Sequence, residues 1–420
     1  MKRNNLQEDK TLFESIKKER KRRNDTLEMI PSENHTSPAV LEAMSTILTD
    51  KYAEGYPKKR YYGGNEYIDE VEVLAQKRAQ RLFNVPFANV QPYSGSPANM
   101  AVYLACMEPG EKVLGMNLKA GGHLTHGWKV SFSGIYYDSA FYGVSEETER
   151  IDLEEVEKIA KKEKPKLIWV GGSAYPREFD WKGFSKIADE VGAYLAADIA
   201  HIAGLIVAGV HDSPAKHVDV ITTTTHKTLR GPRGGMVMVT EKGLNKDSDL
   251  DKKINKAVFP GLQGGPHEHQ IAAKAVCFKE ALEDDFEDYG RKVVENNKKL
   301  ADELMSNDFR LVTDGTDNHL CLIDLRNKNI GGKKAEELLE LAGITINKNS
   351  IPNDPAKPFN PSGIRIGTPA ITTRGMGESE MVEIAQIMTS VLDKKSEKEA
   401  KKARKKIKKM AEEFSLPYDI

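Results

Sequence analysis

Short hydrophobic runs alternate with amphipathic stretches through the middle of the chain. Four runs of five or six residues are rich in Val, Ile, Leu and Ala, as expected of buried strands, and the stretch at 184–191 has helical periodicity. The predicted strands cover residues 166–170, 193–198, 218–223 and 235–239. Strands that alternate with helices indicate an α/β domain whose mainly parallel sheet is covered on both faces. Ligands of such sheets collect at the carboxyl ends of the strands.

The flanking segments extend this pattern and then change it. The periodicity predicts helices at 39–49, 67–83 and 97–107, and strands at 88–93, 111–116 and 131–137. A long helical stretch follows at 267–307, and the shorter elements after it, at 320–325, 335–341 and 344–346, are typical of a small α+β domain. We therefore expect an N-terminal helical arm at 1–30, a large α/β domain at 31–290 and a small C-terminal α+β domain at 291–420.

Composition and charge exclude several classes of protein. The formal net charge of −1 gives no overall attraction for nucleic acid or anionic membranes. The charged N-terminus has no apolar segment of a secretory signal, and no run is apolar enough to cross a bilayer. Three dispersed cysteines predict neither disulfides nor a zinc site, so we expect a cytoplasmic protein. The basic stretch at 394–410 is interpreted as a solvated helix face, with nucleic-acid binding as the alternative.

A lysine and an aspartate are predicted at the ends of neighbouring strands. Lys227 follows the strand at 218–223 and precedes a Gly-rich loop, and Asp198 ends the strand 29 residues earlier. A desolvated lysine can condense with an aldehyde. A carboxylate at the same sheet edge can hold a pyridine nitrogen protonated, which makes the ring an electron sink. A surface lysine and a capping aspartate are the structural alternatives.

Three further segments carry candidate chemistry. Small residues at 93–100 enter a helix and could form a phosphate cup, although an ordinary capped turn has the same pattern. The tyrosine-rich stretch at 50–64 is typical of a binding loop and contains Glu54, a candidate acid or base. Arg365 lies in an apolar strand, where it could bind a carboxylate or form a structural ion pair. His123 and His126 have no third ligand nearby in the sequence, so we expect no metal.

Taken in order, these segments resemble the serine hydroxymethyltransferases along nearly the whole chain. The matching stretches are MIPSENHTSPAV, YAEGYPKKRYYGG, SGSPAN, GGHLTHG, DIAHIAGL, TTTTHKTLRGPRGG, FPGLQGGP, NKNSIPNDP and SGIRIGTPA. The resemblance implies a fold type I pyridoxal-phosphate transferase, in which the large domain binds the cofactor. It also implies conversion of serine and tetrahydrofolate, or a related pterin, to glycine and the methylene-carrying pterin, in amino-acid biosynthesis and one-carbon metabolism.

The resemblance assigns cofactor contacts to particular positions. Lys227 would carry pyridoxal phosphate as a Schiff base, and Asp198 would pair with the pyridine nitrogen. The other contacts implied within one subunit are His201, Ser173, His123, Ser94, Gly95, Ser96 and His226. In a homodimer with shared active sites, Tyr52, Gly264 and Gly265 would come from the other subunit.

The substrate contacts are implied in the same way. Arg365 and Ser32 would bind the amino-acid carboxylate, while Tyr62 and Glu54 would face the reacting hydroxymethyl group. The catalytic set is Lys227, Glu54, Tyr62, His226 and Asp198, with Glu54 serving the proton transfers. The pterin set is Leu118, Gly122, His123, Leu124, Asn349 and Phe359.

Three departures from the family pattern are visible. Pro97 stands where Gln is usual, the stretch after Gly171 is shorter than usual, which bears on Ser173, and Lys357 replaces Ser before the Pro-Phe pair near the pterin. Two other functions are considered. One is a folate-independent aldolase acting on threonine-like 3-hydroxy amino acids, which would not need the pterin set. The other is a non-catalytic scaffold or an RNA-binding protein.

Overall fold

A seven-stranded sheet forms the centre of the larger part of the molecule. The computed structural model describes residues 5–418. The order is β4 (Phe87–Asn89), β10 (Gly235–Val239), β9 (Val220–Thr224), β8 (Tyr194–Asp198), β7 (Leu167–Val170), β5 (Lys112–Met116) and β6 (Asp138–Tyr142). β9, β8, β7, β5 and β6 run parallel, and β10 and β4 are antiparallel to their neighbours. The predicted α/β class with a mainly parallel sheet is confirmed.

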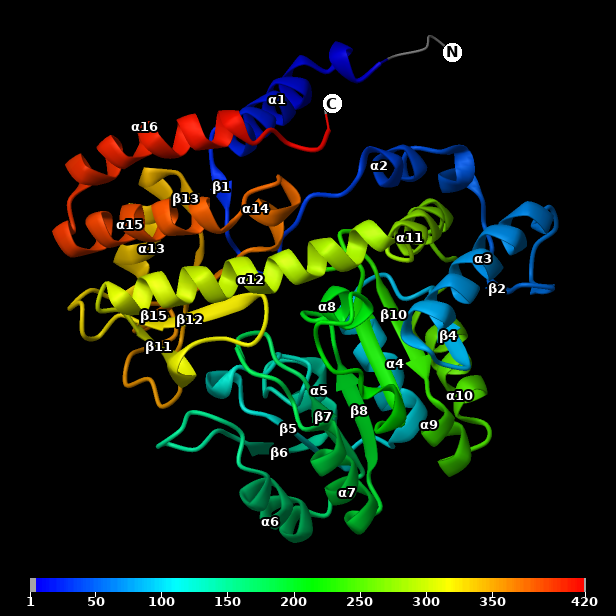
Figure 1. The fold of residues 1–420 in the computed structure, drawn as a ribbon. Helices are drawn as coiled ribbons and strands as arrows, with labels where there is room; N and C mark the ends of the chain where they lie inside the picture. Colours follow the sequence, from blue (N-terminus) through cyan, green and yellow to red (C-terminus); the bar gives the residue numbers. More distant parts are fainter. Residues whose placement is uncertain (1–4, 419–420) are drawn as a thin grey trace.

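Apolar side chains cover both faces of this sheet. On one face, α4 (Gly95–Cys106) packs on β8, β9 and β10, in a cluster that contains Trp169 and Val237. On the other face, a larger cluster includes α7 (Trp181–Val191), α8 (Ala203–Val207) and α11 (Glu268–Glu280). The remaining helices of this part are α2 (Pro38–Met44), α3 (Glu66–Phe83), α5 (Phe132–Tyr136), α6 (Leu153–Glu163), α9 (Glu241–Lys246) and α10 (Leu250–Lys256). Figure 1 shows the parallel strands with helices on both sides.

A second sheet with its own hydrophobic cluster forms the C-terminal part. Its order is β11 (Arg310–Leu311), β12 (Leu320–Asp324), β15 (Gly363–Gly367) and β14 (Asn347–Asn349). The helices around it are α13 (Gly332–Ala342), α14 (Pro369–Thr373), α15 (Glu378–Lys394) and α16 (Glu397–Glu413). The long helix α12 (Asp284–Ser306) contributes to both hydrophobic clusters, so position 290, the proposed domain boundary, lies inside a continuous helix. The division at 290 stays a prediction.

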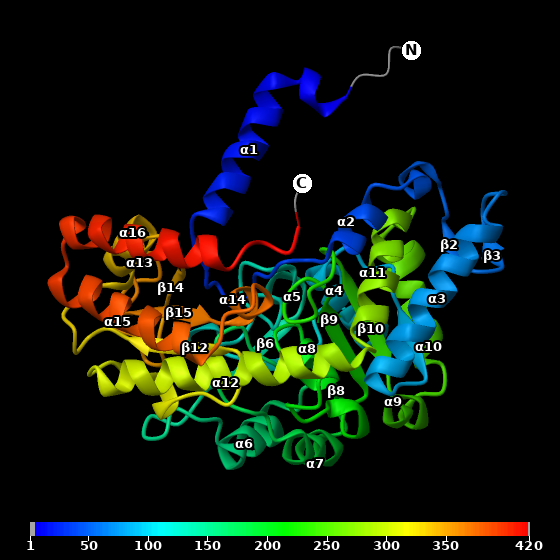
Figure 2. The same cartoon turned by 45° about the horizontal axis from the view of Figure 1, so that its top comes forward.

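The N-terminal segment contacts the C-terminal part. β1 (Leu27–Glu28) pairs in parallel with β13 (Ile344–Thr345), and Leu27 and Met29 are buried in the C-terminal cluster. α1 (Lys10–Asn24) projects away from the body of the chain, and none of its residues is buried (Figure 2). The first four residues of the predicted arm lie outside the described residues.

Two expectations about individual elements are wrong. The stretch at 131–137 contains the short helix α5 (Phe132–Tyr136) rather than a strand, because Phe132 and Tyr137 both pack on the ring of Tyr103 and the chain must turn between them. The helical stretch at 267–307 is two helices, α11 and α12, separated by a break at Ala281–Glu283. Predicted helices at 67–83 and 97–107, and the four central strands, are confirmed to within two residues.

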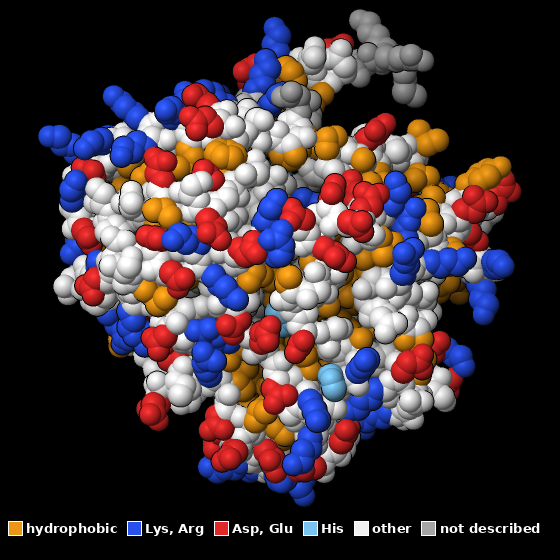
Figure 3. Space-filling view, in the orientation of Figure 1, with side chains coloured by type: hydrophobic (Ala, Val, Ile, Leu, Met, Phe, Trp, Pro, Cys, Tyr) orange, Lys and Arg blue, Asp and Glu red, His pale blue; other side chains and the backbone are white. Residues whose placement is uncertain are grey.

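The surface carries charges of both signs. Blue side chains gather over α16 at the upper left of Figure 3, whereas orange side chains are visible near α2 at the upper right. Over residues 5–418, the chain contains no helix with the length and apolar character needed to cross a membrane.

Candidate active site

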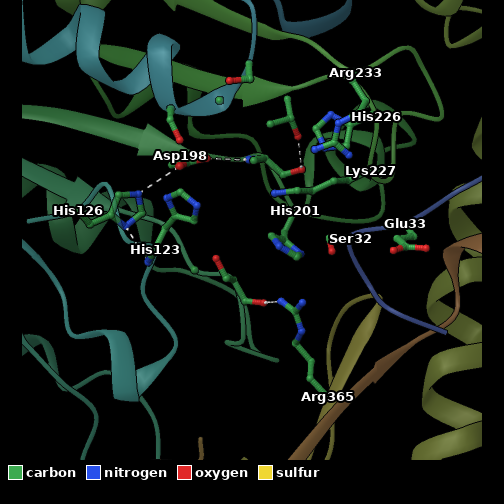
Figure 4. A pocket seen from close by; sticks show the side chains of 17 residues that line it. Ser32, Glu33, His123, His126, Asp198, His201, His226, Lys227, Arg233 and Arg365 are labelled. Atoms are coloured by element: carbon green, nitrogen blue, oxygen red, sulfur yellow. Dashed lines mark hydrogen bonds and ion pairs between the residues drawn. The ribbon is translucent and has the colours of Figure 1, made fainter. Parts of the chain in front are cut away.

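The largest concentration of candidate residues lines one cavity of about 430 Å³. It lies where the carboxyl ends of β8 and β9 meet the N-terminus of α4, and the C-terminal part closes it with β15 (Figure 4). The residues around it are Ser32, Glu33, Ser94, Gly95, Ser96, His123, His126, Gly172, Ser173, Asp198, Ala200, His201, Thr224, His226, Lys227, Arg233 and Arg365. Its size suits a small organic cofactor together with an amino acid.

Lys227 lies in the loop that follows β9. Its side chain is half-buried in the cavity wall, and burial lowers the pKa of Lys227 to about 8, with Arg365 and Arg233 acting in the same direction and Asp198 opposing them. The backbone of the loop is fixed, since the Asn34 amide donates to the Lys227 carbonyl and the neighbouring Thr228 hydroxyl donates to the His201 carbonyl. A lysine amine in this setting is partly neutral near neutral pH and is therefore nucleophilic.

Asp198 ends β8 and is held ionised by hydrogen bonds. Burial opposes its charge, but the contact with His126 and the nearby His123 and Lys227 outweigh burial and hold the pKa of Asp198 below its usual range. Oδ2 accepts from the Asn99 amide at 2.8 Å and lies 3.1 Å from His126 Nε2. Oδ1 accepts from the Ala200 N–H at 3.1 Å.

Asn99 and His126 were not predicted as part of this network. Asn99 is buried one turn inside α4, and its amide also donates to the Thr125 hydroxyl at 2.7 Å. The ring of His126 stacks on Trp169. The sequence contains a signal for Asn99, since it lies four residues after Gly95 on the helix that starts at the cavity. His126 was considered from the sequence only as a metal ligand, and nothing local indicated its contact with Asp198.

His123 projects into the cavity beside Asp198. Its Nδ1 accepts from the Thr125 N–H at 3.2 Å and lies 2.7 Å from the Thr125 hydroxyl, which fixes the orientation of the ring. Burial lowers the pKa of His123 to about 4, so the ring is neutral. Ligand atoms of His123, His126 and Asp198 lie within 4.8 Å of one another. Asp198 is therefore a third potential ligand that the fold brings near from a distant part of the sequence, and the expectation that no metal is bound stays a prediction.

The start of α4 offers donors for an anion. Ser94 is the N-cap residue, but its hydroxyl forms no capping hydrogen bond, and Ser94, Gly95 and Ser96 line the cavity where the first N–H groups of the helix have no intrahelical partner. Gly95 lets the helix start close to β9, because a Cβ atom there would lie 2.8 Å from Cγ2 of Thr224. Arg233, which was not predicted, adds positive charge, and burial together with Arg233 lowers the pKa of His226 to about 3.

Arg365 enters the cavity from β15 on the opposite side. Its Nε donates to Asn347 Oδ1 at 3.0 Å, and its Nη1 donates to the Ser173 carbonyl. Burial lowers the pKa of Arg365 to about 10, which still leaves the guanidinium charged at neutral pH. Arg365 forms no ion pair with another described residue, so the alternative of a structural ion pair is wrong. Ser32 lies at the same end of the cavity.

Several predicted residues do not line this cavity within the described chain. Five of them lie together on another surface: Tyr52, Glu54, Tyr62, Gly264 and Gly265. A Cβ at Gly264 would lie 3.0 Å from Glu54 Oε1, and one at Gly265 would lie 3.0 Å from the Tyr52 ring. The predicted pterin residues Leu118, Gly122, Leu124, Asn349 and Phe359 also lie outside the cavity lining. Leu124 and Phe359 are exposed.

The donor set of the cavity fits pyridoxal phosphate. Nζ of Lys227 forms no hydrogen bond or ion pair within residues 5–418, and Nδ1 of His226 is buried without a partner there. An unpaired amine, an ionised carboxylate and a helix N-terminus together match an aldehyde, a pyridinium and a phosphate. A fold of this type with these groups at the strand ends defines a pyridoxal-phosphate enzyme of the fold type I class.

Comparison with known proteins gives the family. The sequence model described as serine hydroxymethyltransferase matches residues 6–388. A serine hydroxymethyltransferase of Acidothermus cellulolyticus is 55% identical over 377 residues, which cover 90% of this chain and 87% of that protein. The chain belongs to the serine hydroxymethyltransferase family. It is a pyridoxal-phosphate-dependent enzyme that converts serine and tetrahydrofolate to glycine and 5,10-methylenetetrahydrofolate.

Proposed function

We propose that Lys227 and Asp198 hold opposite ends of the cofactor ring in the reaction of this enzyme. When bound, pyridoxal phosphate supplies an electron sink for the carbanion that forms on the amino acid. The Lys227 amine would hold the cofactor through its aldehyde group and would release product. The ionised Asp198 would keep the ring nitrogen protonated. The observation that carries the proposal is that both groups line one cavity while Asn99 and His126 hold the carboxylate charged.

The rest of the cavity divides between phosphate and substrate. Ser94, Gly95, Ser96 and His226 are proposed to hold the phosphate, and His123 to stack on the ring, with Ser173 and His201 near its hydroxyl. Arg365 is proposed to bind the substrate carboxylate with help from Ser32. This assignment is supported by the buried, charged guanidinium, which has N–H groups left over after its two contacts.

We propose that two copies of the chain share their active sites across a homodimer interface. The surface that carries Tyr52, Glu54 and Tyr62 has unusually many exposed apolar residues, with Ile47 84%, Tyr61 74% and Tyr67 69% exposed. Such a surface is expected to be covered by a partner. Glu54 and Tyr62 of one subunit would then face the hydroxymethyl group held by the other, with Tyr52, Gly264 and Gly265 near its phosphate.

The dimer proposal has a direct test in mixed variants. Lys227→Ala and Glu54→Gln should each abolish most activity. If Glu54 acts across the interface, random re-association of the two variants should restore about a quarter of wild-type activity, because half the dimers are hybrids with one intact site. If Glu54 acts within its own chain, no hybrid has an intact site, and activity that stays at the background of the separate variants would contradict the proposal.

The pterin is proposed to bind beside Leu118, Gly122, His123, Leu124, Asn349 and Phe359. Leu124 and Phe359 offer exposed apolar surface for a flat ring system. Replacing Leu124 with Ser should raise the KM for tetrahydrofolate while leaving folate-independent cleavage of 3-hydroxy amino acids unchanged. Equal loss of both activities would contradict this assignment.

We also propose that the enzyme works in the cytoplasm. Cys106, Cys277 and Cys321 are buried free thiols, which is compatible with a reducing compartment. Fractionation of cells that produce the untagged chain would test this, with recovery in the cytosolic fraction expected and recovery in an extracytoplasmic fraction contradicting it.

A further inference from the structure

His201 and His319 form a buried histidine pair at the wall of the cavity. Their Nδ1 and Nε2 atoms, respectively, are 3.1 Å apart, and the ring centroids are 5.4 Å apart. His201 follows the carboxyl end of β8, whereas His319 immediately precedes β12 of the second sheet. The pair therefore joins the sheet that carries Asp198 to the sheet that carries Arg365. His319 is not among the residues that line the cavity, and its hydrogen bond to a cavity residue is the one to His201.

The hydrogen bond between the two rings carries a single proton. Burial lowers the pKa of His319 to about 3 and lowers the pKa of His201 well below its usual value, so both rings are neutral and each carries one N–H. In one arrangement His319 Nε2 donates to His201 Nδ1, and the proton of His201 is on Nε2. In the other arrangement His201 donates, and the proton of His319 is on Nδ1.

The surroundings of His319 favour the first arrangement. Its Nδ1 is buried and has no hydrogen-bond partner within residues 5–418. A proton there would be a buried donor without an acceptor, which native proteins rarely tolerate. Arg365, Lys227 and His211 are the groups that act electrostatically on His319, and the first two carry positive charge that repels an N–H and stabilises a lone pair.

The backbone around both histidines holds the pair in place. The His201 carbonyl accepts from the Thr228 hydroxyl at 2.9 Å, and the same hydroxyl accepts from the Gly204 N–H at 2.9 Å. The His319 carbonyl accepts from the Thr368 N–H at 3.2 Å, and a Cβ on Gly367 would lie 2.6 Å from that carbonyl. These contacts fix the backbone at both positions, so the two rings project from backbone segments that are held in place.

We propose that His319 is a positioning residue that fixes His201 as its Nε2–H tautomer, so that His201 offers a hydrogen-bond donor to an anionic oxygen in the cavity. The identity of this oxygen rests on the proposed function, in which His201 lies near the ring hydroxyl of the cofactor. A donor at this point stabilises the ionised form of the hydroxyl. Nδ1 of His201 is occupied by His319, so the ring cannot turn over to present a lone pair instead.

The tautomer can be measured without the cofactor. The ¹⁵N resonances of the His201 ring in apoprotein labelled at histidine distinguish protonated from unprotonated nitrogen, and the signal is assigned with a His201→Gln variant. We expect the proton on Nε2. A proton on Nδ1 of His201 in the wild-type protein would overturn the proposal, and this measurement does not depend on the folding of a His319 variant.

Two variants then separate positioning from general structural support. His319→Gln places an amide donor where Nε2 stands, whereas His319→Leu removes the donor. The matched control is His35→Leu, since His35 is also buried, has an unpartnered Nε2 and does not line the cavity. All three lose a buried polar ring, so all three are expected to unfold at lower urea concentration than the wild type.

The expected readouts differ between the variants. His319→Leu should lower the affinity of the apoprotein for pyridoxal phosphate about tenfold, as expected for one hydrogen bond, and should shift the pH dependence of the bound cofactor's absorbance. His319→Gln should restore both readouts to near the wild-type values, and His35→Leu should leave both unchanged. Equal affinity and spectra in His319→Leu and wild type would overturn the proposal if a His201→Leu variant does lose cofactor affinity.

Failure of the proposed function would look different. If His201 has the Nε2 proton in wild type and His319→Gln, and loses it in His319→Leu, the role of His319 stands. Cofactor affinity that is unchanged in a His201→Leu variant would then show that the ring hydroxyl does not bind at His201, which contradicts the site assignment rather than the histidine pair.

Discussion

Replacing Asp198 with Asn tests the electrostatic design of the site. The carboxylate accepts three hydrogen bonds, from the Asn99 amide, His126 and the Ala200 N–H, and retains acceptor capacity for a cofactor nitrogen. An asparagine has one acceptor oxygen and one NH₂ group. Whichever way the amide turns, its NH₂ group faces a donor that the carboxylate accepted, and the negative charge is lost.

The size of the effect follows from these contacts. The loss of a charge-assisted hydrogen bond to the cofactor should weaken pyridoxal-phosphate binding about 10- to 100-fold. At saturating cofactor, kcat should fall by on the order of a hundredfold or more, because a neutral amide does not hold the ring nitrogen protonated. The assays are cofactor titration of the apoprotein by absorbance and the tetrahydrofolate-dependent conversion of serine to glycine.

Asp219→Asn is the matched control for this change. Asp219 is a fully buried carboxylate that accepts from the Leu195 N–H and pairs with Lys246, away from the cavity lining. The Asp219→Asn substitution should lower the urea concentration at which the protein unfolds without changing its affinity for the cofactor. A wild-type kcat in Asp198→Asn at saturating cofactor would refute the reasoning.

Three further changes have definite expected outcomes. Asn99→Leu should weaken cofactor binding about tenfold in absorbance titrations, since the catalytic carboxylate loses one donor, and unaltered binding would contradict this. Arg365→Lys should lower kcat/KM for serine about 10- to 100-fold through KM while the cofactor spectrum stays unchanged, because an ammonium cannot bind a carboxylate bidentately. Burial lowers the pKa of His35, His226 and His319 to about 3, so the folded apoprotein takes up fewer protons than the unfolded chain below pH 6.5. Each of these histidines should therefore stabilise the folded state above pH 6.5, and its contribution to the free energy of unfolding should fall by about 1.4 kcal/mol per pH unit as the pH drops from 6.5 toward the folded pKa. Urea midpoints that do not fall between pH 7 and pH 5 would contradict this expectation.

The site residues that lie at the ends of strands could be predicted from the sequence. Asp198 and Lys227 follow apolar runs that had to be buried strands, and parallel neighbours bring their carboxyl ends to one edge. The start of α4 could also be predicted, because small residues precede an apolar helix.

Other contacts depend on long-range packing that no local pattern records. His126 reaches Asp198 because its ring stacks on Trp169 of β7, and His319 reaches His201 across two sheets. The strand expected at 131–137 is a helix because of the buried ring of Tyr103, which is 28 residues earlier than Ser131. Glu54 and Tyr62 have no cavity contact within one chain, so only the family resemblance gave them a role.

The most direct test of the account is to identify the lysine that carries the cofactor. Lys274 is the chemical rival, since burial also lowers its pKa to about 7, but its Nζ donates to the carbonyls of Val90, Pro92 and Gly235. After borohydride reduction of the holoenzyme and proteolysis, peptide mass spectrometry should find the phosphopyridoxyl group on Lys227 and on no peptide of a Lys227→Ala variant. A phosphopyridoxyl group on Lys274, or no fixed cofactor in the wild-type protein, would contradict the account.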